Sequence, residues 1–272
     1  MREILLPFGP QGPGTAAVKA AFALAKRHRS TVHAAFYPRV PAPMIVDPMS
    51  PGVISYDGAA EDVAAQRAEA QAALERKLTA LSKSTGDDDV RLDLDGLGSW
   101  HKLAELSRVF DVTVLTRTAE SGDWQMMFES VLFEGGRPVM LVPEDWSGDL
   151  GARVGVAWNR STETARLVGQ TMDVLRAADH VDIVEVEGFH ISGPDGSALK
   201  RYVAGHDVPV ELITAAADSG GPGRSFLAQA KAANTDLLLK GAYTQSRLTQ
   251  MIFGGATKQI LEEASIPVIF AH

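Results

Sequence analysis

The sequence repeats one unit, and this repeat constrains the fold more than any other feature. A short apolar run starts at Ile4, a turn-rich loop and a segment with helical spacing follow, and the next apolar run includes Val32. The same order recurs from Val154 to Asp182, and both intervals span 28 residues. A strand, a crossover helix and a second parallel strand need roughly 30 residues. We therefore expect two copies of a unit built from βαβ crossovers.

The later segments of the two copies also correspond. The paired segments are 91–95 with 208–213, 103–109 with 226–233, 112–115 with 237–239, and 137–143 with 266–270. Strands and helices that alternate in this way predict an α/β fold with two tandem doubly wound domains, each with a mostly parallel sheet. The polar segment 144–151 interrupts the pattern, so we place the domains at 1–146 and 151–272. We expect them to pack through the closing strands 139–142 and 268–270, since a parallel sheet leaves an edge that needs cover.

Composition excludes several classes of protein. A formal net charge of −8 argues against a protein that binds nucleic acid or an anionic membrane surface. The chain has no cysteine, which excludes disulfides, thiolate metal sites and cysteine nucleophiles. Its seven histidines form no i,i+4 pair, so no metal site is expected. The N-terminus leads into a strand without a signal-peptide pattern, and no apolar run reaches the roughly 20 residues that span a bilayer. We expect a soluble, cytoplasmic protein.

The end of the chain carries the strongest functional signal. The apolar run 237–239 leads through Lys240 to Gly241, and Gly254 and Gly255 later precede a segment with helical spacing. A strand, a glycine-marked loop and a helix N-terminus can surround an anion with backbone N–H groups and the positive end of the helix. Lys240 could contact such an anion or simply be exposed to solvent.

The first copy carries an eroded form of this pattern. Thr116 stands where the first glycine would be, and the segment that follows contains one glycine, Gly122, before the helix. The interval from Thr116 to the proline of the closing strand is four residues shorter than its counterpart in the second copy. We therefore do not expect the first copy to bind phosphates in this way. Any pocket of nucleotide size is expected in the second copy, at the ends of strands 154–158 and 236–240.

The tail motifs resemble those of a known family. The segments GAYTQSRL at 241–248, FGGAT at 253–257 and IPVIFAH at 266–272 are similar to the C-terminal signature of universal stress proteins. The first half resembles the same unit, so the whole chain is similar to a tandem two-domain member. The resemblance implies an adenine nucleotide α-hydrolase-like fold with an open five-stranded parallel sheet in each domain. It also implies that the two domains pair about a pseudo-two-fold axis.

The resemblance also implies a site for ATP or AMP in the second copy, with departures. Gly241 and Gly254 match the first and third glycines of the family's ATP pattern, but Thr244 replaces the second. Gly255 stands where the family has Ser or Thr, and the acidic position at the end of the first strand is Asn159. Asn159 could contact the ribose or adenine, or could only cap the following helix. The implied nucleotide-binding residues are Ala157, Trp158, Asn159, Val186, Gly241, Thr244, Gly254, Gly255 and Thr257.

Two functions remain open on these residues. One is a stress-response regulatory protein that binds an adenine nucleotide in its second domain and acts through a ligand-dependent population shift. The other is an interaction scaffold with both sites decayed, for an unknown protein partner. An enzyme of a related fold would need a phosphate loop after a first strand, and neither 9–14 nor 159–162 supplies one. No catalytic constellation is present, so we expect no enzyme; a further homodimer remains open.

Two loops allow more than one interpretation. Segment 38–58 contains five prolines among apolar residues, and it could be a lid over the crevice or a surface strap. Segment 219–225 superficially suggests a phosphate loop, but it lacks the required lysine and glycine spacing. A flexible connection is the better interpretation of 219–225.

Overall fold

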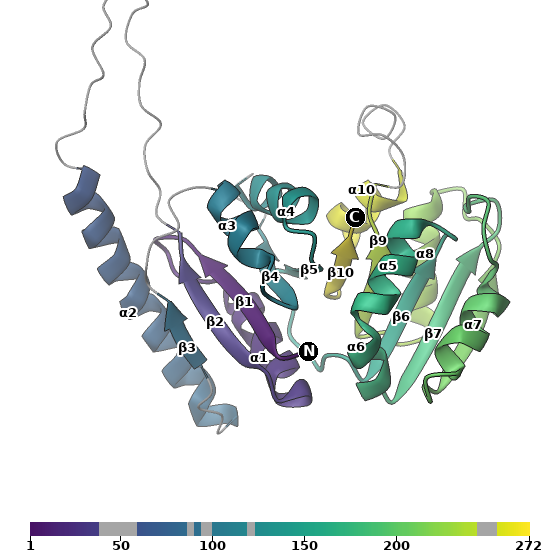
Figure 1. The fold of residues 1–272 in the computed structure, drawn as a ribbon, viewed down its shortest axis with the longest axis horizontal. Helices are drawn as coiled ribbons and strands as arrows, with labels where there is room; N and C mark the ends of the chain where they lie inside the picture. Colours follow the sequence, from purple (N-terminus) through teal and green to yellow (C-terminus); the bar gives the residue numbers. More distant parts are fainter. Residues whose placement is uncertain (38–58, 86–89, 94–99, 119–122, 244–254) are drawn as a thin grey trace, which may run out of the picture.

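A computed structural model describes residues 1–37, 59–85, 90–93, 100–118, 123–243 and 255–272 (Figure 1). The loop 38–58, with its two interpretations, lies outside these residues. The N-terminal half contains β1 (Glu3–Phe8), α1 (Thr15–His28), β2 (Thr31–Phe36), α2 (Ala59–Thr85), β3 (Val90–Asp93), α3 (Trp100–Ser107), β4 (Val112–Arg117), α4 (Asp123–Glu134) and β5 (Val139–Pro143).

The C-terminal half repeats this order of elements. It contains β6 (Arg153–Trp158), α5 (Thr162–Gln170), α6 (Met172–Ala177), β7 (His180–Val186), α7 (Gly196–Ala204), β8 (Val210–Ala215), α8 (Pro222–Ala232), β9 (Leu237–Gly241), α10 (Ala256–Glu263) and β10 (Val268–Ala271). Helix α8 starts at Pro222, so half of the expected flexible connection 219–225 is a helix start. Proline favours this first helical position because its missing N–H would be unpaired there anyway.

The described strands form one sheet in the order β3-β2-β1-β4-β5-β10-β9-β6-β7-β8. Each half contributes five strands that pair in parallel, and the order of the second half mirrors that of the first. The predicted α/β fold with two doubly wound units is therefore confirmed. The halves meet through an antiparallel pairing of β5 with β10, in which Ile269 lies opposite Met140. This confirms the expected packing through the closing strands.

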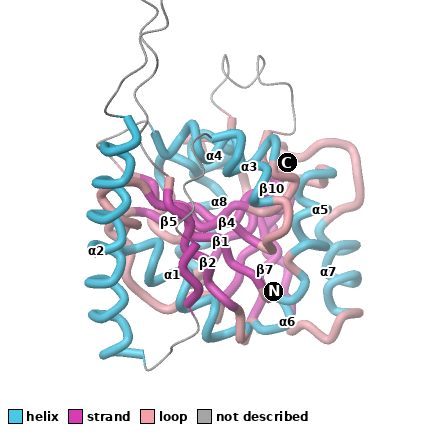
Figure 2. The backbone as a smooth tube through the Cα atoms, turned by 60° about the vertical axis from the view of Figure 1, so that its left-hand side comes forward, coloured by secondary structure: helices cyan, strands magenta, loops and turns pink. Residues whose placement is uncertain are grey.

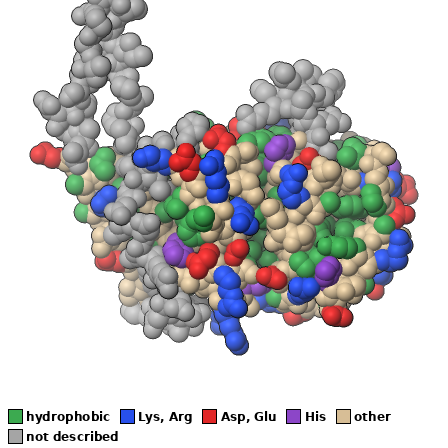
Figure 3. Space-filling view, in the orientation of Figure 1, with side chains coloured by type: hydrophobic (Ala, Val, Ile, Leu, Met, Phe, Trp, Pro, Cys, Tyr) green, Lys and Arg blue, Asp and Glu red, His purple; other side chains and the backbone are tan. Residues whose placement is uncertain are grey.

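Helices cover both faces of the sheet (Figure 2). One core packs α1, α5, α6 and α7 against one face, and a second core packs α3, α4, α8 and α10 against the other. Central strands such as β1 and β9 are buried on both faces, which explains their nearly continuous apolar sequences. On the face seen in Figure 3, Lys and Arg side chains are interspersed with Asp and Glu rather than gathered in one patch. No helix in the described ranges combines the length and the apolar character that a bilayer crossing requires.

An aspartate joins the first and fourth strands in each half. The carboxylate of Asp236, just before β9, accepts hydrogen bonds of 2.7, 2.9 and 3.0 Å from the backbone N–H groups of Gly151, Ala152 and Arg153. Asp111, just before β4, accepts from the N–H groups at the start of β1. These carboxylates satisfy backbone donors where the strand ladder begins. They hold the two central strands of each half in register.

Candidate functional site

A doubly wound sheet opens a crevice at the carboxyl ends of its central strands, where the strand order reverses. In the N-terminal half this place lies at the ends of β1 and β4, and in the C-terminal half at the ends of β6 and β9. Ala157, Trp158 and Val186 are buried at the ends of β6 and β7, and Gly241 ends β9. The structure therefore places these predicted residues, with Asn159 following Trp158, at one edge of the sheet.

The remaining predicted residues belong to the loop before α10 and to its start. Gly255 is the N-cap of α10, and Thr257 is buried in its first turn. Thr244 and Gly254 lie outside the described residues. No side chain of the described residues caps α10, and its first turn carries no acidic residue. The first N–H groups of a helix have no intrahelical acceptor, so this N-terminus suits an anion.

Gly241 packs directly against the first turn of α5. A Cβ atom at position 241 would lie 2.4 Å from both the backbone nitrogen and the hydroxyl of Thr164. In the N-terminal half the same kind of contact joins α1 to the end of β4, but the residue types are exchanged. A Cβ atom at Gly14, the N-cap of α1, would lie 2.2 Å from the hydroxyl of Thr116. Each half thus pairs one glycine with one threonine, which explains why Thr116 stands where the second half has Gly241.

Asn159 is bonded to the first turn of the helix that follows it. Its side-chain oxygen accepts a hydrogen bond of 2.7 Å from the hydroxyl of Thr164. Ser161 is the N-cap of α5 and accepts from the backbone nitrogen of Thr164 at 3.2 Å. The N-cap of α5 is therefore Ser161 rather than Asn159, and the carboxamide oxygen of Asn159 is already engaged.

The segment between β7 and α7 is fastened to the end of β6. The indole of Trp158 donates a hydrogen bond of 3.0 Å to the main-chain oxygen of Pro194. The backbone nitrogen of Ile191 donates to the oxygen of Asn159 at 3.2 Å. Arg160 pairs with the buried carboxylate of Glu185 at 2.7 Å, and that carboxylate also accepts from the nitrogen of Gly196 at 3.0 Å. These bonds order the segment 187–195 beside the predicted site.

Lys240 is buried, and among the described residues no carboxylate forms a direct ion pair with it. Its residue is 2% exposed, and its ammonium donates to the main-chain oxygen of Gly241 at 2.5 Å. Burial lowers the pKa of Lys240 to about 8, an effect that the negative charge of Glu163 partly opposes. A buried cation therefore precedes the glycine loop. The expectation that Lys240 is simply exposed is wrong.

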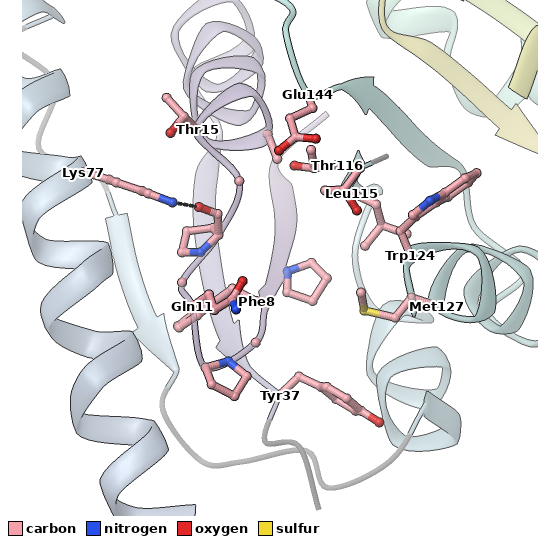
Figure 4. A pocket seen from close by; sticks show the side chains of 18 residues that line it. Phe8, Gln11, Thr15, Tyr37, Lys77, Leu115, Thr116, Trp124, Met127 and Glu144 are labelled. Atoms are coloured by element: carbon pink, nitrogen blue, oxygen red, sulfur yellow. Dashed lines mark hydrogen bonds between the residues drawn. The ribbon is translucent and has the colours of Figure 1, made fainter. Parts of the chain in front are cut away.

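A cavity of about 550 Å³ lies at the crevice of the N-terminal half (Figure 4). The pocket that we expected in the C-terminal half stays a prediction, because residues 244–254 beside that crevice lie outside the described residues. The walls of the N-terminal cavity come from the loop between β1 and α1, the ends of β2 and β4, helices α2 and α4, and the turn after β5. Its lining includes Phe8, Leu115 and Met127 as apolar side chains, and Lys77 and Glu144 as charged ones. None of these five residues was predicted as a site residue, and the proline- and glycine-rich loop 9–14 is the sequence signal that could have indicated the cavity.

The loop between β1 and α1 is held from two directions. Gly12 has a φ of +76° and donates from its backbone nitrogen to the oxygen of Gly9 at 2.9 Å. The ammonium of Lys77, on α2, donates to the main-chain oxygen of Pro13. Burial and the positive charge of Arg76 lower the pKa of Lys77. The loop therefore has a defined shape at the edge of the cavity.

The whole fold matches that of solved structures. The crystal structure of a universal stress protein from Archaeoglobus fulgidus DSM 4304 matches with a TM-score of 0.70, over 99% of this chain and 95% of that one, at 14% identity. The chain has the universal stress protein fold. A functionally unknown protein from Pseudomonas aeruginosa PAO1 matches at a TM-score of 0.59 and 14% identity, over 100% of this chain and 92% of that one.

A protein from Pseudomonas aeruginosa UCBPP-PA14, provisionally named a universal stress protein, also matches. Its TM-score is 0.56 at 13% identity, over 100% of this chain and 93% of that one. No protein-family sequence profile and no curated protein sequence matches the chain. The structural matches thus show the universal stress protein fold over the full tandem length. A ligand or partner has to be argued from the residues of the site.

Proposed function

We propose that this chain is a tandem universal stress protein with a regulatory role in the stress response, and that its C-terminal half binds an adenine nucleotide, ATP or AMP. The observation that carries this proposal is the end of β9. There the buried ammonium of Lys240 is followed by Gly241, whose bare backbone packs against the start of α5. A cation at the start of a glycine-marked loop suits a phosphate group.

The start of α10 supports the same proposal. Gly255 opens this helix without a side-chain cap from the described residues, and Thr257 in its first turn supplies a hydroxyl. Phosphates would meet the helix N–H groups, while the base would lie toward the ends of β6 and β7, near Ala157, Trp158, Asn159 and Val186. This set of groups binds rather than transforms a nucleotide, so the proposed mechanism is a ligand-dependent population shift.

The shift has a defined physical path into the other half. Phe133, on α4, packs its ring against Tyr243 at 5.1 Å and against His272 at 4.8 Å between ring centroids. Tyr243 lies two residues after the end of β9, where the glycine loop begins. A nucleotide that moves Tyr243 would therefore change the packing of α4.

A second candidate function is an interaction scaffold with both sites decayed. It is favoured by the contacts that already occupy the crevice of the C-terminal half. The oxygen of Asn159 is engaged by Thr164, and the edge of Trp158 is engaged by Pro194. On this alternative the chain would present its surface to a protein partner without a nucleotide.

Calorimetry with ATP and AMP separates the two functions. If the loop binds phosphate, Thr244→Gly should tighten binding, because the family's ATP pattern has a glycine at this position, which lets backbone approach the ligand. Gly254→Val should abolish binding, because it replaces the third glycine of the same pattern with a branched side chain. Lys240→Met should weaken ATP more than AMP, whereas Lys231→Met, an exposed change on α8, should have no effect. If neither the wild type nor any variant binds at millimolar nucleotide, the scaffold is the correct function.

A further inference from the structure

The cavity of the N-terminal half has its own chemistry, which differs from that of a phosphate site. We infer that it binds a small aromatic molecule that carries an amino group and no phosphate. This second site lies in the other half from the proposed nucleotide site and takes a different class of ligand. It therefore goes beyond the proposed function.

The size of the cavity fits such a ligand. Its volume of about 550 Å³ lies within the range of roughly 300 to 1,000 Å³ that is usual for small-molecule sites. Phe8 from β1, Leu115 from β4 and Met127 from α4 contribute apolar surface from three elements. In Figure 4 the thioether of Met127 points from α4 toward the loop side of the cavity. Aromatic rings and a polarisable thioether pack well against a flat apolar body.

The loop that borders the cavity is poorly suited to phosphate. A phosphate loop works through several converging backbone N–H groups, but Pro7, Pro10 and Pro13 have none. The N–H of Gly12 is already bonded to the oxygen of Gly9. The ammonium of Lys77 is likewise bonded to the oxygen of Pro13. Several of the groups that would cradle a triphosphate are therefore absent or already bonded, and the N-terminus of α1 is the main one that remains.

One end of the cavity instead presents acceptors. Glu144 and Thr116 lie next to each other there, from the turn after β5 and from the end of β4 (Figure 4). Among the described residues no ion pair to Glu144 is found, whereas the hydroxyl of Thr116 is buried against Gly14. The carboxylate of Glu144 can accept from an ammonium group.

The N-terminus of helix α1 opposes the preference of Glu144 for a cationic ligand. Thr15 and Ala17 line the cavity at the N-terminus of this helix, whose partial positive charge favours anions. If that effect outweighed Glu144, the preferred ligand would be an aromatic carboxylate. Three probes that share a phenyl group but are cationic, neutral or anionic therefore show which ligand charge the cavity prefers.

The probes are 2-phenylethylamine, 2-phenylethanol and phenylacetate, each titrated into the full chain at low salt by calorimetry. The amine should bind about tenfold more tightly than phenylacetate, with the alcohol between them, a difference of about 1.4 kcal/mol. Glu144→Gln should remove most of the preference for the amine and leave the alcohol unchanged. Asp145→Asn is the matched control, because it changes the same charge at the next residue, which does not line the cavity.

The fluorescence of Trp124 shows whether the probes bind in this cavity. Trp124 lines the cavity, so each probe that binds there should change its emission, and Trp124→Phe should remove that change without removing binding. The inference is overturned if phenylacetate binds most tightly, if Glu144→Gln and Asp145→Asn act alike, or if no probe binds at millimolar concentration. Unchanged Trp124 emission during binding would also overturn it. Nucleotide binding by the C-terminal half is measured separately, so the two proposals fail independently.

Discussion

The guanidinium of Arg117, at the end of β4, donates a hydrogen bond of 2.7 Å to the main-chain oxygen of Ala264 in the other half of the chain. It donates a second bond of 2.7 Å to the oxygen of Leu261. These carbonyls belong to the C-terminal end of α10, where the last oxygens of a helix have no intrahelical donor and a cation is favourable. Arg117 therefore joins the two halves beside the β5–β10 pairing.

Arg117→Met should reduce the free energy of unfolding by about 2 to 4 kcal/mol, because it removes two charge-assisted hydrogen bonds and leaves two carbonyls without them. Urea denaturation followed by circular dichroism measures the loss. Arg108→Met is the matched control, since Arg108 bonds to the oxygen of Glu134 at 3.1 Å within one half and at an exposed position. Equal losses from the two substitutions would show that Arg117 is not a special link between the halves.

Lys240 should make stability rise with pH. The pKa of Lys240 falls from 10.5 to about 8 on folding, which corresponds to a penalty of about 3 kcal/mol at neutral pH. Below pH 8 the group is protonated in both states and the penalty is fully present. Between about pH 8 and 10.5 the folded state has lost the proton and the unfolded state keeps it, so the penalty is relieved.

Lys240→Met should therefore be more stable than the wild type at pH 7, and the difference should shrink toward pH 10. The measurement is the difference in unfolding free energy between the two proteins across this range, in which other titrating groups cancel. A difference that stays constant with pH would mean that the ammonium is not desolvated as its burial indicates.

The exchanged glycine–threonine contacts should respond differently to a second substitution. Gly14→Ala places a methyl group against the side chain of Thr116, and should cost about 1 to 3 kcal/mol. Thr116→Ala should recover part of this loss, because the closest obstructing atom belongs to a side chain. Gly241→Ala should not be recovered by Thr164→Ala, since its Cβ would also lie 2.4 Å from the backbone nitrogen of residue 164. Two double-mutant cycles on thermal stability test this contrast.

Asp236→Asn should destabilise the C-terminal half. Both oxygens of Asp236 accept from backbone N–H groups, and an amide nitrogen in place of one oxygen leaves N–H donors unpaired, at a cost of about 1 to 3 kcal/mol. Asp149→Asn, an exposed change in the linker, should have no measurable effect. Hydrogen exchange at Gly151, Ala152 and Arg153 should accelerate only in the Asp236 variant; unchanged protection there would contradict the role of this carboxylate.

The local pattern of the sequence determined the elements and their order. Alternating apolar and turn-rich segments, repeated after Ile4 and after Val154, predicted two doubly wound units, because the periodicity of a strand or helix is a property of neighbouring residues. The closing strands 139–142 and 268–270 were also predicted to meet, since their apolar edges need cover. The paired aspartates Asp111 and Asp236, just before equivalent strands, were not predicted, and only the structure showed their bonds to the backbone.

Only the tertiary structure decided what occupies the ends of those strands. The contact of Gly14 with Thr116 and that of Gly241 with Thr164 each join segments far apart in the chain. In the first half the glycine is at the start of the helix and the threonine at the end of the strand, and in the second half the two residue types are reversed. The burial of Lys240 and the cavity beside Glu144 likewise depend on how α5, α2 and α4 approach the sheet. Burial and cavity shape depend on residues that are far apart in the sequence, so a local sequence pattern does not predict them.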